Sequence, residues 1–98
     1  MADYRIAVQA RAQILDIEAF TAARFGTYQA DAYITGLEKT FELIAAYPRI
    51  GRSADELVHG LRRYRYQSHS IYYADNADHV MIRAVFHHAQ DLKPELFE

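Results

Sequence analysis

Residues 60–91 read GLRRYRYQSHSIYYADNADHVMIRAVFHHAQD, and the prediction of the fold depends mainly on this segment. It contains three runs rich in Tyr, Ile, Val and Phe, at residues 61–66, 69–74 and 79–87. Short polar segments separate the runs. Aromatic and β-branched residues in short runs bounded by turn residues are typical of strands. We therefore predict a meander of three adjacent antiparallel strands.

Alternation along these strands separates two faces of the predicted sheet, because successive side chains of a strand point to opposite sides. In the third run, one set of alternating apolar side chains is expected to face the core, namely Val80, Ile82, Ala84 and Phe86. Met81, Arg83, Val85 and His87 fall on the other side. If Tyr64 and Tyr66 face the core, Arg63 and Arg65 join Arg83 and His87 on the open face. This predicts one cationic, partly apolar face that is available to a partner.

The first half of the chain predicts a strand and two helices. Residues 4–8 alternate as a short strand, whereas residues 10–25 and 27–47 carry apolar side chains at helical spacing, such as Ile14, Ile17 and Phe20. Gly26 between them predicts a tight turn, and hence an antiparallel helical hairpin. Pro48 ends the second helix and begins a turn-rich loop. Gly36, inside that helix, costs about 1 kcal/mol relative to alanine and suggests close approach of the neighbouring helix.

The order of these elements predicts an α+β fold of two layers. An N-terminal strand and the three-stranded meander form a small antiparallel sheet, and the helical hairpin packs on one of its faces. With 98 residues, of which 51% are hydrophobic, the chain is expected to form a single domain over residues 1–98. The tail, residues 89–98, leaves two alternatives open. It frays, or it docks through Leu92, Leu96 and Phe97.

Composition narrows the function classes. The chain has no cysteine and shows neither a signal peptide nor an apolar run that could span a membrane, so we expect a cytoplasmic protein. A net charge of -2 argues against a dedicated nucleic-acid binder, although five arginines gather mid-chain, namely Arg49, Arg52, Arg62, Arg63 and Arg65. Adjacent strand residues point to opposite faces, so His87 and His88 are not expected to share a metal ion. The sequence contains no nucleophile elbow, phosphate-binding loop, Cys/His pair or paired-carboxylate pattern, so enzyme classes built on these motifs are not expected.

Four short segments, in order, resemble the ParE branch of the RelE/ParE superfamily of bacterial type II toxins. They are Pro48, Ile50, Gly51 and Arg52 after the second helix; Gly60, Leu61 and Arg62 at the start of the meander; Ser68, His69, Ile71 and Tyr73 in its middle strand; and the closing residues 85–91. The likeness covers nearly the whole chain.

The resemblance implies a RelE/ParE-like fold and a toxin that inhibits growth by binding and poisoning DNA gyrase. Such a toxin has no catalysis and no cofactor of its own. A cognate ParD-like antitoxin with a ribbon-helix-helix domain neutralises it, and operator DNA is contacted only through that antitoxin. For binding to the target or the antitoxin we predict six residues, namely Arg63, Arg65, Arg83, His87, His69 and His88.

Two alternatives stay open. The first is a RelE-like ribosome-dependent mRNA endoribonuclease, in which His87 or His88 would act as the base and the arginines would stabilise the phosphorane. The sequence departs from the RelE pattern, because His69 stands where that pattern favours arginine and no tyrosine follows Tyr73. The second is a non-toxic member that acts only in antitoxin binding and operon autoregulation.

Overall fold

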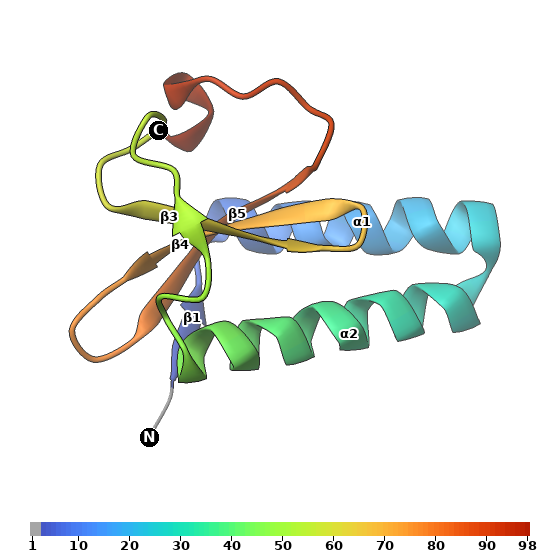
Figure 1. The fold of residues 1–98 in the computed structure, drawn as a ribbon. Helices are drawn as coiled ribbons and strands as arrows, with labels where there is room; N and C mark the ends of the chain where they lie inside the picture. The colour runs from blue at the N-terminus through green and yellow to red at the C-terminus, as the bar shows by residue number, and fades with distance from the viewer. Residues whose placement is uncertain (1–2) are drawn as a thin grey trace.

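A computed structural model describes residues 3–98 and confirms the α+β fold class. Figure 1 shows strand β1 (Tyr4–Ile6) leading into helices α1 (Val8–Phe25) and α2 (Thr27–Ala46). A short strand β2 (Arg52–Ser53) precedes the predicted meander of β3 (Leu61–Tyr66), β4 (His69–Asp75) and β5 (Val80–His87). The chain closes with a 3-10 helix, η1 (Pro94–Phe97). The strands form one sheet in the order β1-β5-β4-β3-β2.

The sheet is mixed, whereas the sequence predicted antiparallel pairing throughout. Strand β1 runs parallel to β5, with Tyr4 opposite Val80 and Ile6 opposite Ile82, and the other three pairs are antiparallel. The chain passes through both helices and three strands between β1 and β5. The alternation of polar and apolar residues shows which side chains of a strand share a face. It does not show which strand pairs with it or in which direction, so the parallel pairing could not be predicted from either strand.

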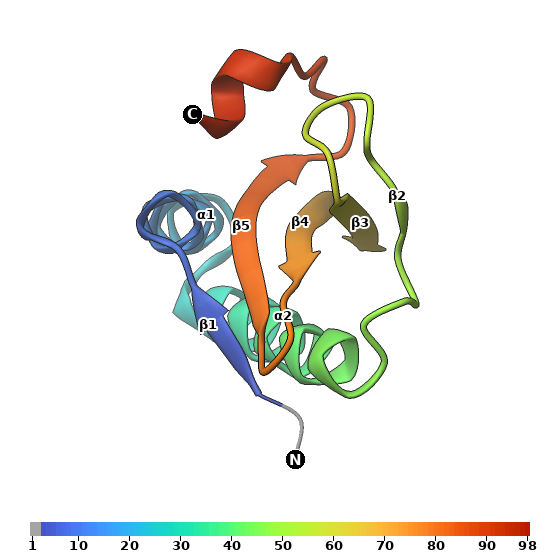
Figure 2. The ribbon, with the colours of Figure 1, turned by 90° about the vertical axis from the view of Figure 1, so that its left-hand side faces the viewer.

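The helical hairpin forms as predicted and covers one face of the sheet. Gly26 joins the helices with φ at 92°, a backbone conformation that glycine adopts without steric cost. In Figure 2 both helices lie on one side of the curved sheet, and the C-terminal segment lies at the top of the view, past the end of β5. The main core between these layers consists of buried apolar side chains from α1, α2 and two strands, β4 and β5, namely Ala10, Leu37, Phe41, Ile44, Ile71, Tyr73, Val80, Ile82 and Val85.

Gly36 faces the sheet and not the neighbouring helix, so that expectation was wrong. A Cβ atom on Gly36 would meet the Tyr66 hydroxyl and lie 2.7 Å from Tyr66 Cζ. Tyr66 comes from β3, and its ring packs edge-on against Tyr33 of α2 at 5.1 Å. The glycine therefore lets the end of β3 approach α2.

A β-bulge at Arg83 breaks the predicted alternation of β5. Tyr72 pairs with Ala84 and the next residue, Tyr73, pairs with Ile82, so Arg83 is an extra residue on β5. Beyond the bulge the faces exchange. Val85 joins the core under the helices, whereas Ala84 and Phe86 belong to a second apolar cluster on the opposite face. The face predicted from simple alternation is therefore correct only up to Ile82.

The C-terminal tail docks, which resolves the alternative left open. Phe97 is buried in the second cluster with Tyr72 and Phe86, and Leu92 packs at its edge. The Nη2 atom of Arg83 donates a hydrogen bond to Phe97 O at 2.9 Å. The tail thus covers the β5 side of the second face and leaves the β3 side open.

Candidate functional site

The loop between α2 and β2 is fixed against the sheet by one buried hydroxyl. Tyr73 Oη accepts a hydrogen bond from Gly51 N at 2.9 Å and donates one to Pro48 O at 2.8 Å. Arg62 Nη1 donates to Gly51 O at 2.7 Å. A Cβ atom on Gly51 would lie 2.6 Å from Arg63 O, so this position has room only for glycine. These contacts determine where Arg52 lies on the sheet edge.

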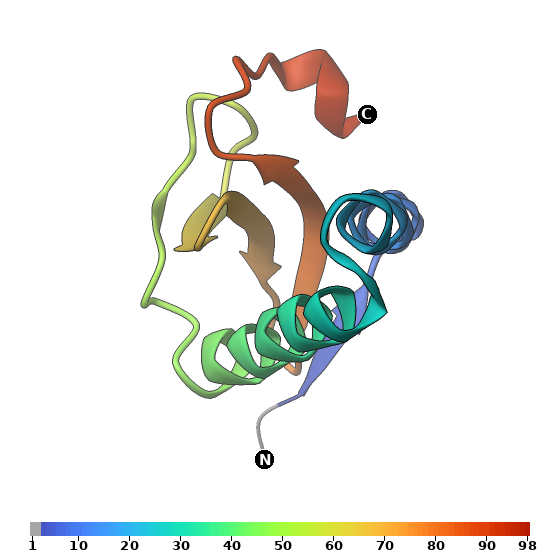
Figure 3. The same ribbon diagram turned by 90° about the vertical axis from the view of Figure 1, so that its right-hand side faces the viewer.

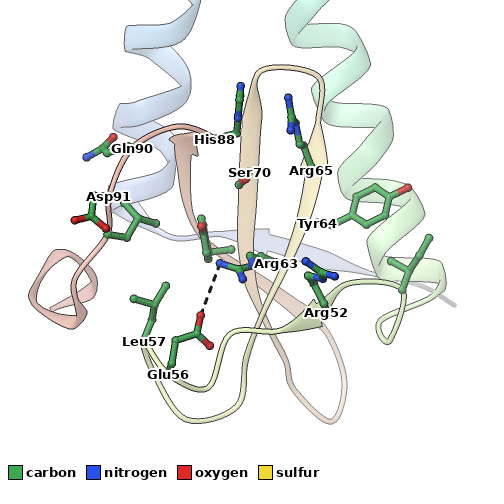
Figure 4. A pocket seen from close by; sticks show the side chains of 13 residues that line it. Arg52, Glu56, Leu57, Arg63, Tyr64, Arg65, Ser70, His88, Gln90 and Asp91 are labelled. Carbon is green, nitrogen blue, oxygen red and sulfur yellow. Dashed lines mark ion pairs between the residues drawn. The ribbon is translucent and has the colours of Figure 1, made fainter.

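An open pocket of about 720 Å³ lies on the second face beside the tail, whose residues Gln90, Asp91 and Leu92 line one side of it. We define the cationic pocket by six lining residues: Arg52, Arg63, Arg65, Ser70, Tyr72 and His88. Figure 4 shows the side chains of β2 and β3 beside those of β4 and of the segment after β5. Arg52 and Arg63 are directly opposed across the β2–β3 pair, and Arg65 opposes Ser70 across β3–β4.

The arginines of the cationic pocket are only partly neutralised by the chain itself. Glu56 Oε2 lies 3.7 Å from Arg63 Nη1, which is an ion pair but too long for a hydrogen bond; the Glu56 side chain is exposed and that of Arg63 is partly exposed. Arg65 donates from Nε to Gln67 O at 2.7 Å, so its terminal amino groups have no partner within residues 3–98. Arg52 likewise has no side-chain hydrogen bond or ion pair to any described residue. The pocket thus holds three guanidinium groups and two carboxylates, those of Glu56 and Asp91, and the one ion pair among them within residues 3–98 is the weak pair between Glu56 and Arg63.

A second surface, the hairpin groove, lies between the helical hairpin and the ends of β4 and β5. It has a volume of about 550 Å³, and we define it by Ile17, Phe20, Phe25, Tyr33, His69 and His87. Figure 3, which faces the hairpin tip, shows α1 and α2 beside these strands. Phe20 and Phe25 are 61% and 63% exposed, although helical spacing placed Phe20 with the core residues. The groove therefore presents aromatic surface to solvent.

Three histidines connect the two surfaces. His87 and His88 stack with ring centroids 4.8 Å apart, and His69 meets His87 edge-on at 5.6 Å. The Tyr33 hydroxyl lies 2.7 Å from His69 Nδ1. Burial, with smaller contributions from His87 and His88, lowers the pKa of His69 below 6.5. Desolvation followed by the charge of Arg65 also lowers the pKa of His88. Both imidazoles are therefore held toward their neutral forms at neutral pH.

The structure divides the six predicted residues between different surfaces. Arg63, Arg65 and His88 meet in the cationic pocket, whereas His69 and His87 line the hairpin groove. Arg83 lies in neither, because the bulge turns it toward the tail. The expectation that Arg83 and His87 share one open face with Arg63 and Arg65 was therefore wrong.

Sequence reasoning missed several residues of both surfaces, namely Arg52, Glu56, Ser70, Phe20, Phe25 and Tyr33. Arg52 belonged to the mid-chain arginine cluster, which was the one available signal. No ordinary pattern marks the others. Within residues 3–98 no three His, Asp or Glu side chains are placed to share a metal ion. Over the same range, no helix combines the length and apolar character needed to cross a membrane.

Comparisons with known proteins agree on one family. Residues 4–92 match the family described as the ParE toxin of the type II toxin-antitoxin system parDE. The chain is 32% identical over 96 residues to Toxin ParE1 of Caulobacter vibrioides, covering 98% of this chain and 99% of the relative. It is 36% identical over 70 residues to Toxin ParE1 of Mycobacterium tuberculosis, covering 71% of each chain. A structure of the chromosomal ParDE system from P. aeruginosa matches with a TM-score of 0.77 and 13% identity, covering 89% of this chain and 96% of that one.

Proposed function

The chain belongs to the ParE family of toxins of type II toxin-antitoxin systems, and on that premise we propose that it inhibits DNA gyrase by binding rather than by catalysis. A ParD-like antitoxin with a ribbon-helix-helix domain holds it inactive and carries the contact with operator DNA. Gyrase inhibition of this kind is typical of the family. The observation on this chain that supports a binding function is the exposed aromatic surface of the hairpin groove.

The hairpin groove is suited to an apolar segment of a protein partner. Phe20 and Phe25 lie beside each other at the hairpin tip, and Arg24 stacks over their rings at 5.5 and 5.9 Å. Exposed apolar patches rimmed by polar groups are typical of protein-binding surfaces. We assign the antitoxin to this groove, with His69 and His87 at its inner end. Arg63, Arg65 and His88 then remain free to face the target.

The direct test measures gyrase with the purified full-length chain. We expect loss of supercoiling and accumulation of cleaved DNA, and we expect that stoichiometric antitoxin restores both. The nuclease alternative predicts the reverse, namely cleavage of mRNA on translating ribosomes with gyrase unaffected. Normal growth during expression without the antitoxin, together with an unaffected gyrase, would support the non-toxic alternative.

Substitutions in the groove test the antitoxin assignment separately. Phe20→Ser or Phe25→Ser should weaken antitoxin binding by about 30-fold or more, because buried aromatic anchors typically contribute at least about 2 kcal/mol to an interface. Tyr28→Ser is the matched control, since Tyr28 is an aromatic residue near the same tip, is 83% exposed and lies outside the groove. Equal affinities for the three variants, measured by calorimetry, would show that the antitoxin binds elsewhere.

A further inference from the structure

The cationic pocket contains an arrangement that folding alone does not favour. Arg52 and Arg63 are register partners on adjacent strands, and Arg65 follows Arg63 on the same face of β3. Like charges directly opposite each other across a strand pair are destabilising. Glu56 offsets this repulsion only weakly, because it lies 3.7 Å from Arg63 and is itself exposed. An anion bound between the three guanidinium groups would relieve the repulsion.

We propose that the cationic pocket binds the phosphodiester backbone of a single-stranded nucleic acid. Residues two apart on a strand are separated by about 7 Å, so Arg63 and Arg65 are spaced like successive phosphates of one strand. A carboxylate offers two oxygens to one guanidinium fork, whereas a chain of phosphates can accept hydrogen bonds from all three arginines. The ligand class is therefore a phosphodiester backbone, and this binding goes beyond gyrase inhibition because it needs only the isolated chain.

Two other lining residues, Ser70 and His88, fit the same ligand. Ser70 opposes Arg65 in the register and supplies a hydroxyl donor on the floor of the pocket. The exposed ring of His88 lies in the pocket, where a base of a flexible strand can stack, whereas Tyr72 is 4% exposed and only borders the pocket. The Glu56 carboxylate is an internal anion that competes with the ligand for Arg63. An incoming phosphate displaces it from that guanidinium group. The site binds a strand and performs no cleavage.

The test is fluorescence anisotropy of a labelled oligothymidylate with the full-length chain over a salt series. Arg63→Gln and Arg65→Gln should each weaken binding by roughly tenfold, since a charge-assisted hydrogen bond is lost. Each should also reduce the slope of log affinity against log salt by about 0.7, the value for one phosphate contact of a single strand. Arg24→Gln is the charge-matched control outside the pocket and should change neither quantity appreciably. Unchanged binding and slope in both pocket variants would overturn the proposal.

Removal of Glu56 provides a gain of function that does not depend on the stability of an arginine variant. Glu56→Gln should tighten binding by roughly two- to fivefold, the range expected when an exposed ion pair no longer competes. Glu42→Gln, on the exposed surface of α2, changes the net charge equally and should have little effect. An equal gain in affinity for both variants would show that the effect depends only on the net charge of the protein, and it would refute the proposed site. Stronger competition by polyglutamate than by unlabelled oligonucleotide, or equal competition by a mononucleotide, would also refute it.

Discussion

Substitution of Tyr73 by phenylalanine tests how the chain positions the edge of the cationic pocket. The Tyr73 side chain is fully buried, and its hydroxyl joins Gly51 N and Pro48 O. The variant keeps the ring and leaves the buried Gly51 N–H without an acceptor, which costs about 1 to 3 kcal/mol. Loss of the bond to the partly exposed Pro48 carbonyl adds about 0.5 to 1.5 kcal/mol. Together these two losses predict a decrease of about 1.5 to 4.5 kcal/mol in the free energy of unfolding.

Urea denaturation followed by circular dichroism measures this change, and the midpoint of thermal unfolding should fall by at least about 6 °C. Tyr72→Phe is the control on the same strand. Tyr72 is also buried, but its hydroxyl makes no hydrogen bond within residues 3–98, so a change below about 0.5 kcal/mol is expected. Gly51→Ala displaces the same loop and should not add fully to Tyr73→Phe. Equal stabilities of the two phenylalanine variants would refute the assigned role of the Tyr73 hydroxyl.

Three further predictions concern the core, the close contact at Gly36 and the histidines. Phe41→Ala should destabilise the fold by about 3 to 5 kcal/mol in urea denaturation, because the side chain is fully buried beneath the sheet. Gly36→Ala should lower the free energy of unfolding by about 1 to 2 kcal/mol despite its gain in helix propensity, since Tyr66 must move. In a Tyr66→Ala background the same substitution should be neutral or stabilising. A loss of stability that persists in that background would contradict the steric explanation. The lowered pKa of His69 means that the unfolded chain binds more protons, so stability is complete above pH 6.5 and is lost as the pH falls through the folded pKa. His69→Gln should flatten this dependence of unfolding free energy on pH, and an unchanged profile would exclude His69 as its source.

Strand positions and faces were predictable where local pattern alone decides them. The predicted strand at residues 61–66 matches β3, and Tyr64 and Tyr66 pack against the helical core as expected. The helices also follow their apolar spacing, because α2 buries Leu37, Phe41 and Ile44. These features depend on periodicity and turn residues, which are properties of short segments.

The candidate site was predictable only in part. Alternation correctly placed Arg63 and Arg65 on the open face. It failed at Arg83 because one inserted residue, without an unusual side chain, exchanges the two faces of a strand. Phe20 was predicted to be in the core but is exposed. Helical spacing identifies the apolar side of a helix, but it does not show how far the sheet extends beneath that side.

The elements, most of their apolar faces and the family of this toxin could be predicted from the sequence, because each is encoded in the order and spacing of residue types. Three features required the folded chain: β1 pairs in parallel with β5, the tail covers the β5 side of the second face, and Arg52 opposes Arg63. These outcomes depend on which distant segments meet and in which register. That choice is made by the packing of the whole chain and leaves no mark in any single segment.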